Sequence, residues 1–184
     1  ILIVCDGNTC RSPMAKYLFD REAKKASLPV EVSSAGLSAF FGDEMNRTAL
    51  WALSKVGIDG SEHRSRRPNP LELSEYDYIV CLGEGNEKAL LPFVGEEKLL
   101  VPDDEISNPK DEDEKSFEKC RDELLKYILK LINMISQVRI LKLESGDVSA
   151  VAELERECFS TPWSEKALLE SISDESAVFL KAVF

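Results

Sequence analysis

The chain has 184 residues, with 34 acidic and 23 basic side chains and a formal net charge of -11 at pH 7. Such an acidic chain disfavours binding to nucleic-acid phosphates, and no apolar run approaches the roughly 20 residues of a membrane span. Five scattered cysteines and a single histidine lack the spacing of a disulfide scaffold or a metal site. We therefore expect a cytoplasmic protein that binds neither nucleic acid nor membrane and uses no metal or cofactor.

The first thirteen residues hold the most informative pattern of the chain. The short apolar run Ile1–Val4 precedes a Gly7-Asn8 turn signal, which predicts a buried strand that ends in a loop. Pro13 suits the first turn of a helix, and Ser12 suits the cap before it. A loop between strand and helix directs backbone N–H groups and the positive end of a helix dipole at one place, which favours a bound anion. Because the chain starts inside this strand without Met, we expect that a residue or two precede it.

Cys5 opens this loop and Arg11 closes it. A thiol thus lies under the anion, while the planar guanidinium can bind two of its oxygens. The positive field favours the thiolate form of Cys5, which is the nucleophilic form. The alternative, a buried structural Cys5 with a surface Arg11, does not explain the Gly-Asn turn between them.

The following residues predict alternating helices and strands in an α/β domain over residues 1–136. Helical or strand periodicity is found in seven further segments, namely 12–26 (helix), 30–34 (strand, ending at Ala35-Gly36), 44–56 (helix, stopped by Gly57), 78–82 (strand), 86–91 (helix), 99–101 (strand) and 116–136 (helix). A strand, helix and strand in succession imply a right-handed parallel crossover. We therefore expect a doubly wound, four-stranded parallel sheet with a phosphate-binding loop after its first strand.

The stretch from Cys5 to Pro13 closely resembles the active-site loop of the low-molecular-weight protein phosphatases. The resemblance continues through Ser33-Ser34-Ala35-Gly36, His63 with Arg64 and Arg66, the strand 78–82 with Asn86 behind it, and an Asn-Pro before the long helix. The family fold is a doubly wound sheet with its phosphate loop after the first strand. The resemblance implies a phosphorylated protein as substrate and a phosphocysteine intermediate, formed from phosphotyrosine or phosphoarginine.

The resemblance also implies roles for single residues. Cys5 is the nucleophile, Arg11 binds the phosphate, and Ser12 steadies the thiolate; the rest of the phosphate-binding loop is Asp6, Gly7, Asn8, Thr9 and Cys10. Asn8, Ser12, Ser34 and His63 match a polar network behind the loop. Asn8 itself suits a left-handed backbone conformation. For His63 an exposed loop position is the alternative.

The cysteines divide into two groups. By resemblance Cys10 forms a reversible disulfide with Cys5 that protects the nucleophile, and the alternative is a small loop filler. Cys81, Cys120 and Cys158 are expected as buried apolar residues. Arsenate reduction, which uses the same loop with further redox cysteines, is an alternative function.

The chain departs from the family at the general acid. Family members have Asp-Pro before the last helix, whereas this chain has Asn108-Pro109. An amide cannot exchange the proton, and such a loss typically costs ~10²–10⁴-fold in rate. Substitute carboxyls crowd the same loop, at Asp103, Asp104, Glu105, Asp111 and Asp113. Otherwise this run is a solvated acidic loop, and the protein is a phosphate-binding pseudo-phosphatase with weak turnover.

Other positions bear on the pocket and the substrate. Gly83 stands where the family often has Asp, and Lys110 stands where an aromatic often walls the pocket. Thr9 resembles the protein-arginine phosphatases, which have Thr at this place. Tyrosine-directed members often have a branched apolar residue there instead. Phe40 and Phe41 either flank the mouth of the pocket or belong to the core.

Residues 137–184 resemble the first third of the ribosomal-protein alanine N-acetyltransferases of the GNAT superfamily. The pattern predicts a strand at 138–143, a helix at 147–158, a second helix capped by Ser164 and a strand at 178–183. The run Phe159-Ser160-Thr161-Pro162-Trp163-Ser164 supports the resemblance. Because no Gly follows Gly146, we expect no acetyl-CoA binding by this truncated segment; the alternative is a partly ordered appendage of two strands and two helices.

Overall fold

The computed structural model describes residues 1–109, 113–136, 139–174 and 178–183. The chain divides into two compact units, Ile1–Asn133 and Met134–Phe184, and each is described by itself. From the N-terminus the chain forms β1 (Leu2–Cys5), α1 (Arg11–Lys25), β2 (Ser33–Gly36), α2 (Arg47–Ser54), the 3-10 helix η1 (Leu73–Glu75), β3 (Ile79–Cys81), α3 (Asn86–Leu90), η2 (Glu96–Lys98), β4 (Leu99–Leu100) and α4 (Glu114–Ser136). It continues with β5 (Arg139–Lys142), η3 (Ser145–Asp147), α5 (Val148–Cys158), α6 (Glu165–Ile172) and β6 (Leu180–Val183).

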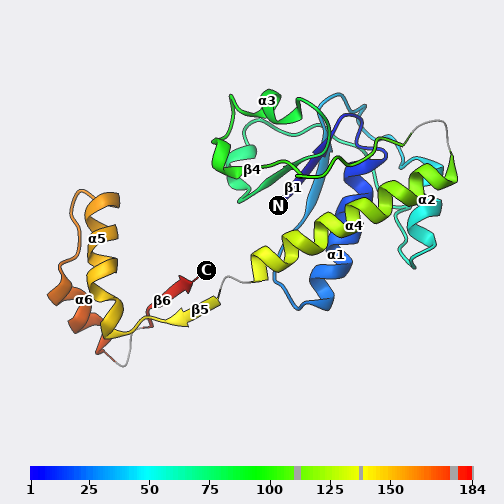
Figure 1. The fold of residues 1–184 in the computed structure, drawn as a ribbon. Coiled ribbons are helices and arrows are strands. Elements are labelled where there is room, and N and C mark those ends of the chain that lie inside the picture. The colour runs from blue at the N-terminus through cyan, green and yellow to red at the C-terminus, as the bar shows by residue number, and fades with distance from the viewer. Residues whose placement is uncertain (110–112, 137–138, 175–177, 184) are drawn as a thin grey trace. The chain divides into compact units, whose positions relative to one another are not determined.

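The first unit is built on a four-stranded sheet in the order β2-β1-β3-β4 (Figure 1). All three strand pairs are parallel, with Cys5 opposite Gly36 and Val4 opposite Cys81. The predicted doubly wound parallel sheet is therefore confirmed. Because β1 pairs with β2 on one side and β3 on the other, its carboxyl end lies at the switch point where such sheets bind ligands.

Both faces of this sheet are covered. Helix α1 packs against β1 and β2 on one face. Residues of β1 and β3, including Leu2 and Cys81, belong to a buried cluster with Leu73, Leu90 and Val94 from the segments that follow. Every residue of β1 is buried, which agrees with its unbroken apolar sequence. This packing fixes the end of the strand that bears Cys5.

Several predicted boundaries in the first unit differ from the observed ones, and three of these differences have a clear physical reason. The second strand spans Ser33–Gly36 rather than 30–34, because its pairing with β1 begins where Leu2 meets Ser33. Helix α2 begins at Arg47 rather than at residue 44, because the side chain of Asn46 accepts hydrogen bonds from the first N–H groups of the helix. Helix α1 begins at Arg11, with Cys10 at the cap position. Ser12 is thus inside the helix rather than its cap.

The second unit contains an antiparallel pair, β5 with β6, and the helices α5 and α6. The predicted order of strand, helix, helix and strand is confirmed, and the Ser164 hydroxyl caps α6 by accepting from the N–H of Ala167. Val148, Ala152 and Leu168 form its small buried cluster. Cys158, predicted to be buried, is exposed at the end of α5. Among the described helices of the whole chain, none is long and apolar enough to cross a membrane.

Candidate active site

The loop after β1 is held against the exit of β2. The N–H groups of Leu37 and Ser38 donate to the carbonyl oxygens of Cys5 and Asp6, at 3.0 and 2.9 Å. A Cβ at Gly36 would lie 2.6 Å from the Asn8 nitrogen and 2.6 Å from the Asp6 oxygen. Only glycine allows the two segments to approach so closely. The sequence Ala35-Gly36 therefore positions the loop as well as ending a strand.

The Cys5 side chain is 3% exposed and has hydrogen-bonding partners from its own loop. Its Sγ lies 3.0 Å from the Ser12 Oγ, and the Asn8 N–H donates to it at 3.3 Å. The Ser12 hydroxyl also lies 3.1 Å from the carbonyl oxygen of Ala35. Because a hydroxyl has a single hydrogen, Ser12 donates it either to Ala35 or to Cys5. A thiolate at Cys5 attracts that hydrogen, so this geometry can stabilise the negative form of the sulfur.

Asn8 organises the network behind the loop from a left-handed backbone conformation, at φ 55°. Its side-chain Nδ2 donates to Ser12 Oγ at 2.9 Å and to Ser34 Oγ at 3.0 Å. Its Oδ1 accepts from the Arg66 N–H at 2.9 Å, and its carbonyl oxygen lies 2.7 Å from His63 Nε2. All of these contacts tie one loop residue to three separate segments of the chain.

His63 is buried, so the interpretation as an exposed loop residue is wrong. Burial lowers the pKa of its imidazole, although the bond to the Asn8 carbonyl opposes this. A neutral ring that donates from Nε2 to that carbonyl fits both facts at pH 7. The structure thus brings Asn8, Ser12, Ser34 and His63 together as the sequence indicated, and their functional roles stay predictions.

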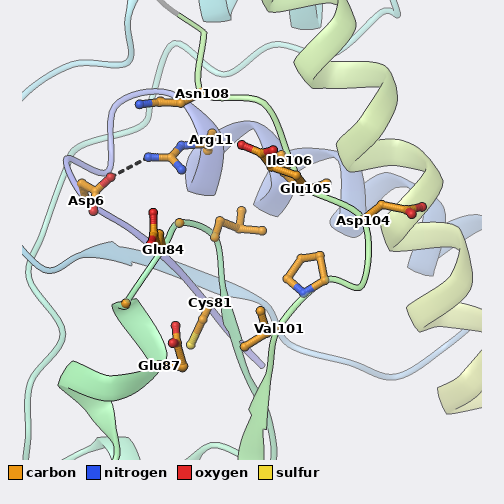
Figure 2. Close-up of a pocket in the computed structure, with 14 residues that line it drawn as sticks. Asp6, Arg11, Cys81, Glu84, Glu87, Val101, Asp104, Glu105, Ile106 and Asn108 are labelled. Carbon is orange, nitrogen blue, oxygen red and sulfur yellow. Dashed lines mark hydrogen bonds and ion pairs between the residues drawn. The ribbon is translucent and has the colours of Figure 1, made fainter.

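Arg11 and Asp6 lie on the wall of a cavity of about 690 Å³, shown in Figure 2. The Arg11 Nη2 donates to Asp6 Oδ2 at 2.6 Å; the Arg11 side chain is 7% exposed and that of Asp6 58%. Besides this one cation, the described lining contains five carboxylates, at Asp6, Glu84, Glu87, Asp104 and Glu105. The electrostatics of the cavity therefore combine one well-placed positive group with an acidic rim.

Asn108 also lines this cavity, near Arg11 in Figure 2. An amide at this place can donate or accept a hydrogen bond but cannot deliver a proton to a leaving group. The departure from the family pattern thus falls inside the candidate site.

The carboxyls proposed as substitutes for this acid are not equivalent. Asp104 and Glu105 line the cavity, whereas Asp103 lines a neighbouring hollow. Asp113 accepts from the Ser116 N–H at the start of α4. Asp111 and also Lys110 lie outside the described residues.

Asp104 is a poor proton donor in this setting. The Lys126 ammonium, hydrogen-bonded to it at 3.1 Å, lowers the pKa of the Asp104 carboxyl, and Lys130 adds to the effect. A carboxyl with a lowered pKa is ionised at neutral pH and has no proton to give. Glu105 is the other proposed substitute that lines the cavity.

The sequence reasoning missed two acidic groups of the cavity and the ion pair of a third. It placed Asp6 in the loop without its ion pair to Arg11, and it did not consider Glu84 or Glu87. The sequence did contain a signal for the two glutamates, because both lie in the segment that follows the strand at 78–82. In a parallel sheet the segments after neighbouring strands meet at the same edge.

Two further candidate residues, Thr9 and Cys10, belong to the loop between β1 and α1. Thr9 is not among the residues that line the cavity, and its Oγ1 lies 3.8 Å from Cys10 Sγ. Burial raises the pKa of the Cys10 thiol. It also raises the pKa of Cys81 and of Cys120 to about 12, and both thiols are buried as predicted.

Phe40 and Phe41 are 75% and 91% exposed, so the interpretation as core residues is wrong. Their backbone is nevertheless fixed, because the Ser65 hydroxyl donates to the Phe40 carbonyl and the Gly42 N–H donates to the Ser65 carbonyl. The segment presents two aromatic side chains to solvent from an anchored loop.

Comparison with known proteins gives relatives of two kinds. The low molecular weight protein-tyrosine-phosphatase Ptp of Acinetobacter johnsonii is 34% identical over 88 residues, which are 48% of this chain and 59% of that protein. The protein-arginine-phosphatase of Geobacillus stearothermophilus is 35% identical over 99 residues, 53% of this chain and 64% of that protein. The chain thus spans about three fifths of the length of these curated relatives.

Solved structures and the family model extend the similarity. The crystal structure of the low molecular weight protein tyrosine phosphatase from T. tengcongensis matches with a TM-score of 0.69 and 29% identity, over 72% of this chain and 97% of that chain. The family model described as low molecular weight phosphotyrosine protein phosphatase matches residues 1–140, well over half of the chain. The loop, the polar network and these matches agree: the chain belongs to the low molecular weight phosphotyrosine protein phosphatase family.

Proposed function

We propose that this protein is a cysteine-dependent protein phosphatase that hydrolyses phosphotyrosine or phosphoarginine through a phosphocysteine intermediate. The observation that carries the proposal is the Cys5 sulfur, which lies within hydrogen-bonding distance of Ser12 and the Asn8 N–H at the end of a buried strand. Arg11 closes the same loop and lines the cavity. Tyrosine and arginine phosphatases both occur among the relatives, and each supports one of the two substrates.

In the first step the Cys5 thiolate attacks phosphorus, and the bond from phosphorus to the leaving oxygen or nitrogen breaks. Loop N–H groups and Arg11 stabilise the charge on the phosphoryl oxygens, and the leaving group takes up a proton. In the second step water attacks the phosphocysteine and releases inorganic phosphate, which returns Cys5 to its thiolate. Both steps are aided when a carboxyl first donates and then accepts a proton.

Asn108 favours a second candidate function. Its place in the cavity lining supports a pseudo-phosphatase that binds a phosphorylated protein through Cys5 and Arg11 with weak turnover. Arsenate reduction has less support, because the buried Cys81 and Cys120 have pKa values raised to about 12 and are poor redox thiolates.

A panel of substrates separates these functions. The protein is assayed for phosphate release from a nitrophenyl phosphate, a phosphotyrosine peptide and a phosphoarginine peptide, and for arsenite formation from arsenate with a thiol reductant. A phosphatase releases phosphate from at least one peptide with repeated turnover. Binding of the peptides with less than one turnover per protein supports the pseudo-phosphatase, and arsenite formation alone contradicts the proposal.

Substitution Thr9→Ile is expected to shift preference from phosphoarginine toward phosphotyrosine. The change replaces a hydroxyl of the phosphate loop with a larger apolar side chain. This side chain should crowd the polar phosphoguanidinium of one substrate more than it crowds the aromatic ring of the other. The measurement is the ratio of kcat/KM for the two peptides, with Thr9→Ser as the matched control that keeps the hydroxyl. An unchanged ratio in the isoleucine variant would show that Thr9 does not select the substrate.

Mild peroxide is expected to inactivate the protein reversibly. Peroxide converts the Cys5 thiolate to a sulfenic acid, and the Cys10 thiol then displaces water to form a disulfide. Peptide mass mapping before and after treatment with dithiothreitol detects the bond. In the Cys10→Ser variant inactivation should become irreversible, because the sulfenic acid is oxidised further. Finding Cys10 reduced in the inactivated parent contradicts this prediction.

We further propose the cytoplasm as its compartment, since a thiolate nucleophile requires a reducing environment. All five cysteines are free, which supports this proposal. Residues 1–136 are proposed as the phosphatase domain and residues 137–184 as a segment similar to the first part of a GNAT acetyltransferase. The strand, helix, helix and strand of the second unit support the latter assignment, and no acetyl-CoA binding is proposed for it.

A further inference from the structure

The guanidinium of Arg11 is almost fully buried, so its charge requires a partner within the protein. Within the described part of the chain its guanidinium donates to one group, the Asp6 carboxylate, at 2.6 Å. The bond uses Nη2 only, and a guanidinium has five N–H donors in a fixed plane. One contact thus sets the orientation of the plane and leaves the other donors for a phosphoryl group.

The surroundings hold both members of this pair in place. The Asp6 backbone is fixed by the Ser38 N–H, which donates to its carbonyl oxygen at 2.9 Å. On the other side, a Cβ at Gly83 would lie 3.1 Å from Arg11 Nη1 and 3.6 Å from Asp6 Oδ2. Gly83 also has a φ of +132°, which L side chains rarely adopt. The pair therefore packs against bare backbone after β3, where a side chain would displace it.

Asp6 affects a phosphate bound at Arg11 in two ways. The carboxylate and the phosphate accept hydrogen bonds from the same guanidinium, and their negative charges repel each other in the same cavity. Glu84 and Glu87 add negative charge to that cavity, but neither is among the described hydrogen-bond partners of Arg11. Of the described carboxylates of this cavity, Asp6 is thus the one placed to affect a phosphate both through Arg11 and through its charge.

We propose that Asp6 is a positioning residue that holds the Arg11 guanidinium in plane for the phosphoryl group and, by its charge, weakens the binding of product phosphate. This inference rests on the proposed function of the same site. It predicts effects of opposite sign when the hydrogen bond and the charge are removed separately. The consequence for turnover is a well-oriented Arg11 together with rapid release of phosphate.

Three variants of Asp6 separate the two contributions. Asp6→Asn keeps an acceptor oxygen for Arg11 but removes the charge, so phosphate should bind roughly tenfold more tightly, and kcat should fall less than in Asp6→Ala. Asp6→Ala removes both, so kcat should fall roughly tenfold while phosphate affinity changes less. Asp6→Glu keeps the charge and should retain the weak phosphate binding of the parent.

Glu84→Gln is the matched control, because it removes the same charge from the same cavity without touching Arg11. Its effect on phosphate affinity should be no more than about threefold. Because Asp6 acts at short range, its effect should also resist added salt better than that of Glu84. Circular dichroism of each variant establishes that the fold is retained; the half-exposed Asp6 side chain makes all three variants compatible with folding.

The measurement is isothermal titration of each full-length variant with inorganic phosphate at low and high salt, together with kcat and KM for a nitrophenyl phosphate. The inference is supported if Asp6→Asn tightens phosphate binding while Asp6→Ala lowers kcat. It is overturned if Asp6→Asn binds phosphate like the parent, or if Glu84→Gln has an equal effect. If the parent binds phosphate but hydrolyses nothing, the proposed function fails, and the titration still decides whether the Asp6 charge weakens phosphate binding.

Discussion

Substitution of Cys5 by Ser is expected to lower turnover by more than about a thousandfold while inorganic phosphate still binds. A serine hydroxyl is a far poorer nucleophile than a thiolate at neutral pH. The binding groups remain, because Arg11 and the N–H groups of the loop are unchanged by the substitution. Steady-state hydrolysis of a nitrophenyl phosphate and a phosphate titration measure the two effects on the same sample.

Cys158→Ser is the matched control for this prediction. It makes the same chemical change at an exposed cysteine of the second unit, which takes no part in the proposed chemistry. Its turnover should equal that of the parent. Residual turnover of the Cys5 variant above roughly a tenth of the parent rate would remove Cys5 from its role as nucleophile.

Asn108→Asp is expected to accelerate hydrolysis of phosphotyrosine strongly. A carboxyl at the cavity wall supplies the proton that the leaving phenolate requires, and general acid catalysis of this kind contributes ~10²–10⁴-fold. A nitrophenolate leaves with little need of protonation, so the first step for the activated ester should gain less. The comparison of kcat/KM for the two substrates before and after the substitution therefore isolates the acid from the nucleophile.

Pre-steady-state kinetics test the same substitution in the second step. The carboxyl that donates the first proton also assists the attacking water, so phosphocysteine should accumulate in the parent and disappear faster in the aspartate variant. Asn108→Ala should behave like the parent, because an amide moves no proton. If Asn108→Asp leaves both substrates and the burst unchanged, a neighbour such as Glu105 or Asp111 already serves as the acid, and the pseudo-phosphatase interpretation fails.

The sheet was predictable because its strands are short, apolar and flanked by turn residues. The run at the start of the chain and the one at residues 79–82 are buried on both faces, and such strands have an unbroken apolar sequence. The second strand was misplaced for a physical reason. Its residues 33–36 contain two serines and a glycine, and their strand conformation results from pairing with β1 rather than from local preference.

The candidate site was predictable to a different extent in each part. The network around Asn8 could be anticipated, because several motif residues at fixed spacing describe one compact loop. The Asp6 to Arg11 ion pair could not, because it depends on side-chain rotamers and on the bare backbone of Gly83. The exposure of Cys158 also escaped prediction. Helical periodicity identifies the apolar face of a helix, but it does not show whether another segment packs against that face.

Trapping the covalent intermediate establishes whether Cys5 is the nucleophile. The parent protein is mixed with excess nitrophenyl phosphate, quenched within milliseconds and digested, and the peptides are examined by mass spectrometry under conditions that preserve phosphorus–sulfur bonds. The account predicts a single phosphoryl group on Cys5, formed at the rate of the burst and absent in Cys5→Ser. A phosphoryl group on another residue, or full turnover with no phosphorylated Cys5 at any time, would contradict it.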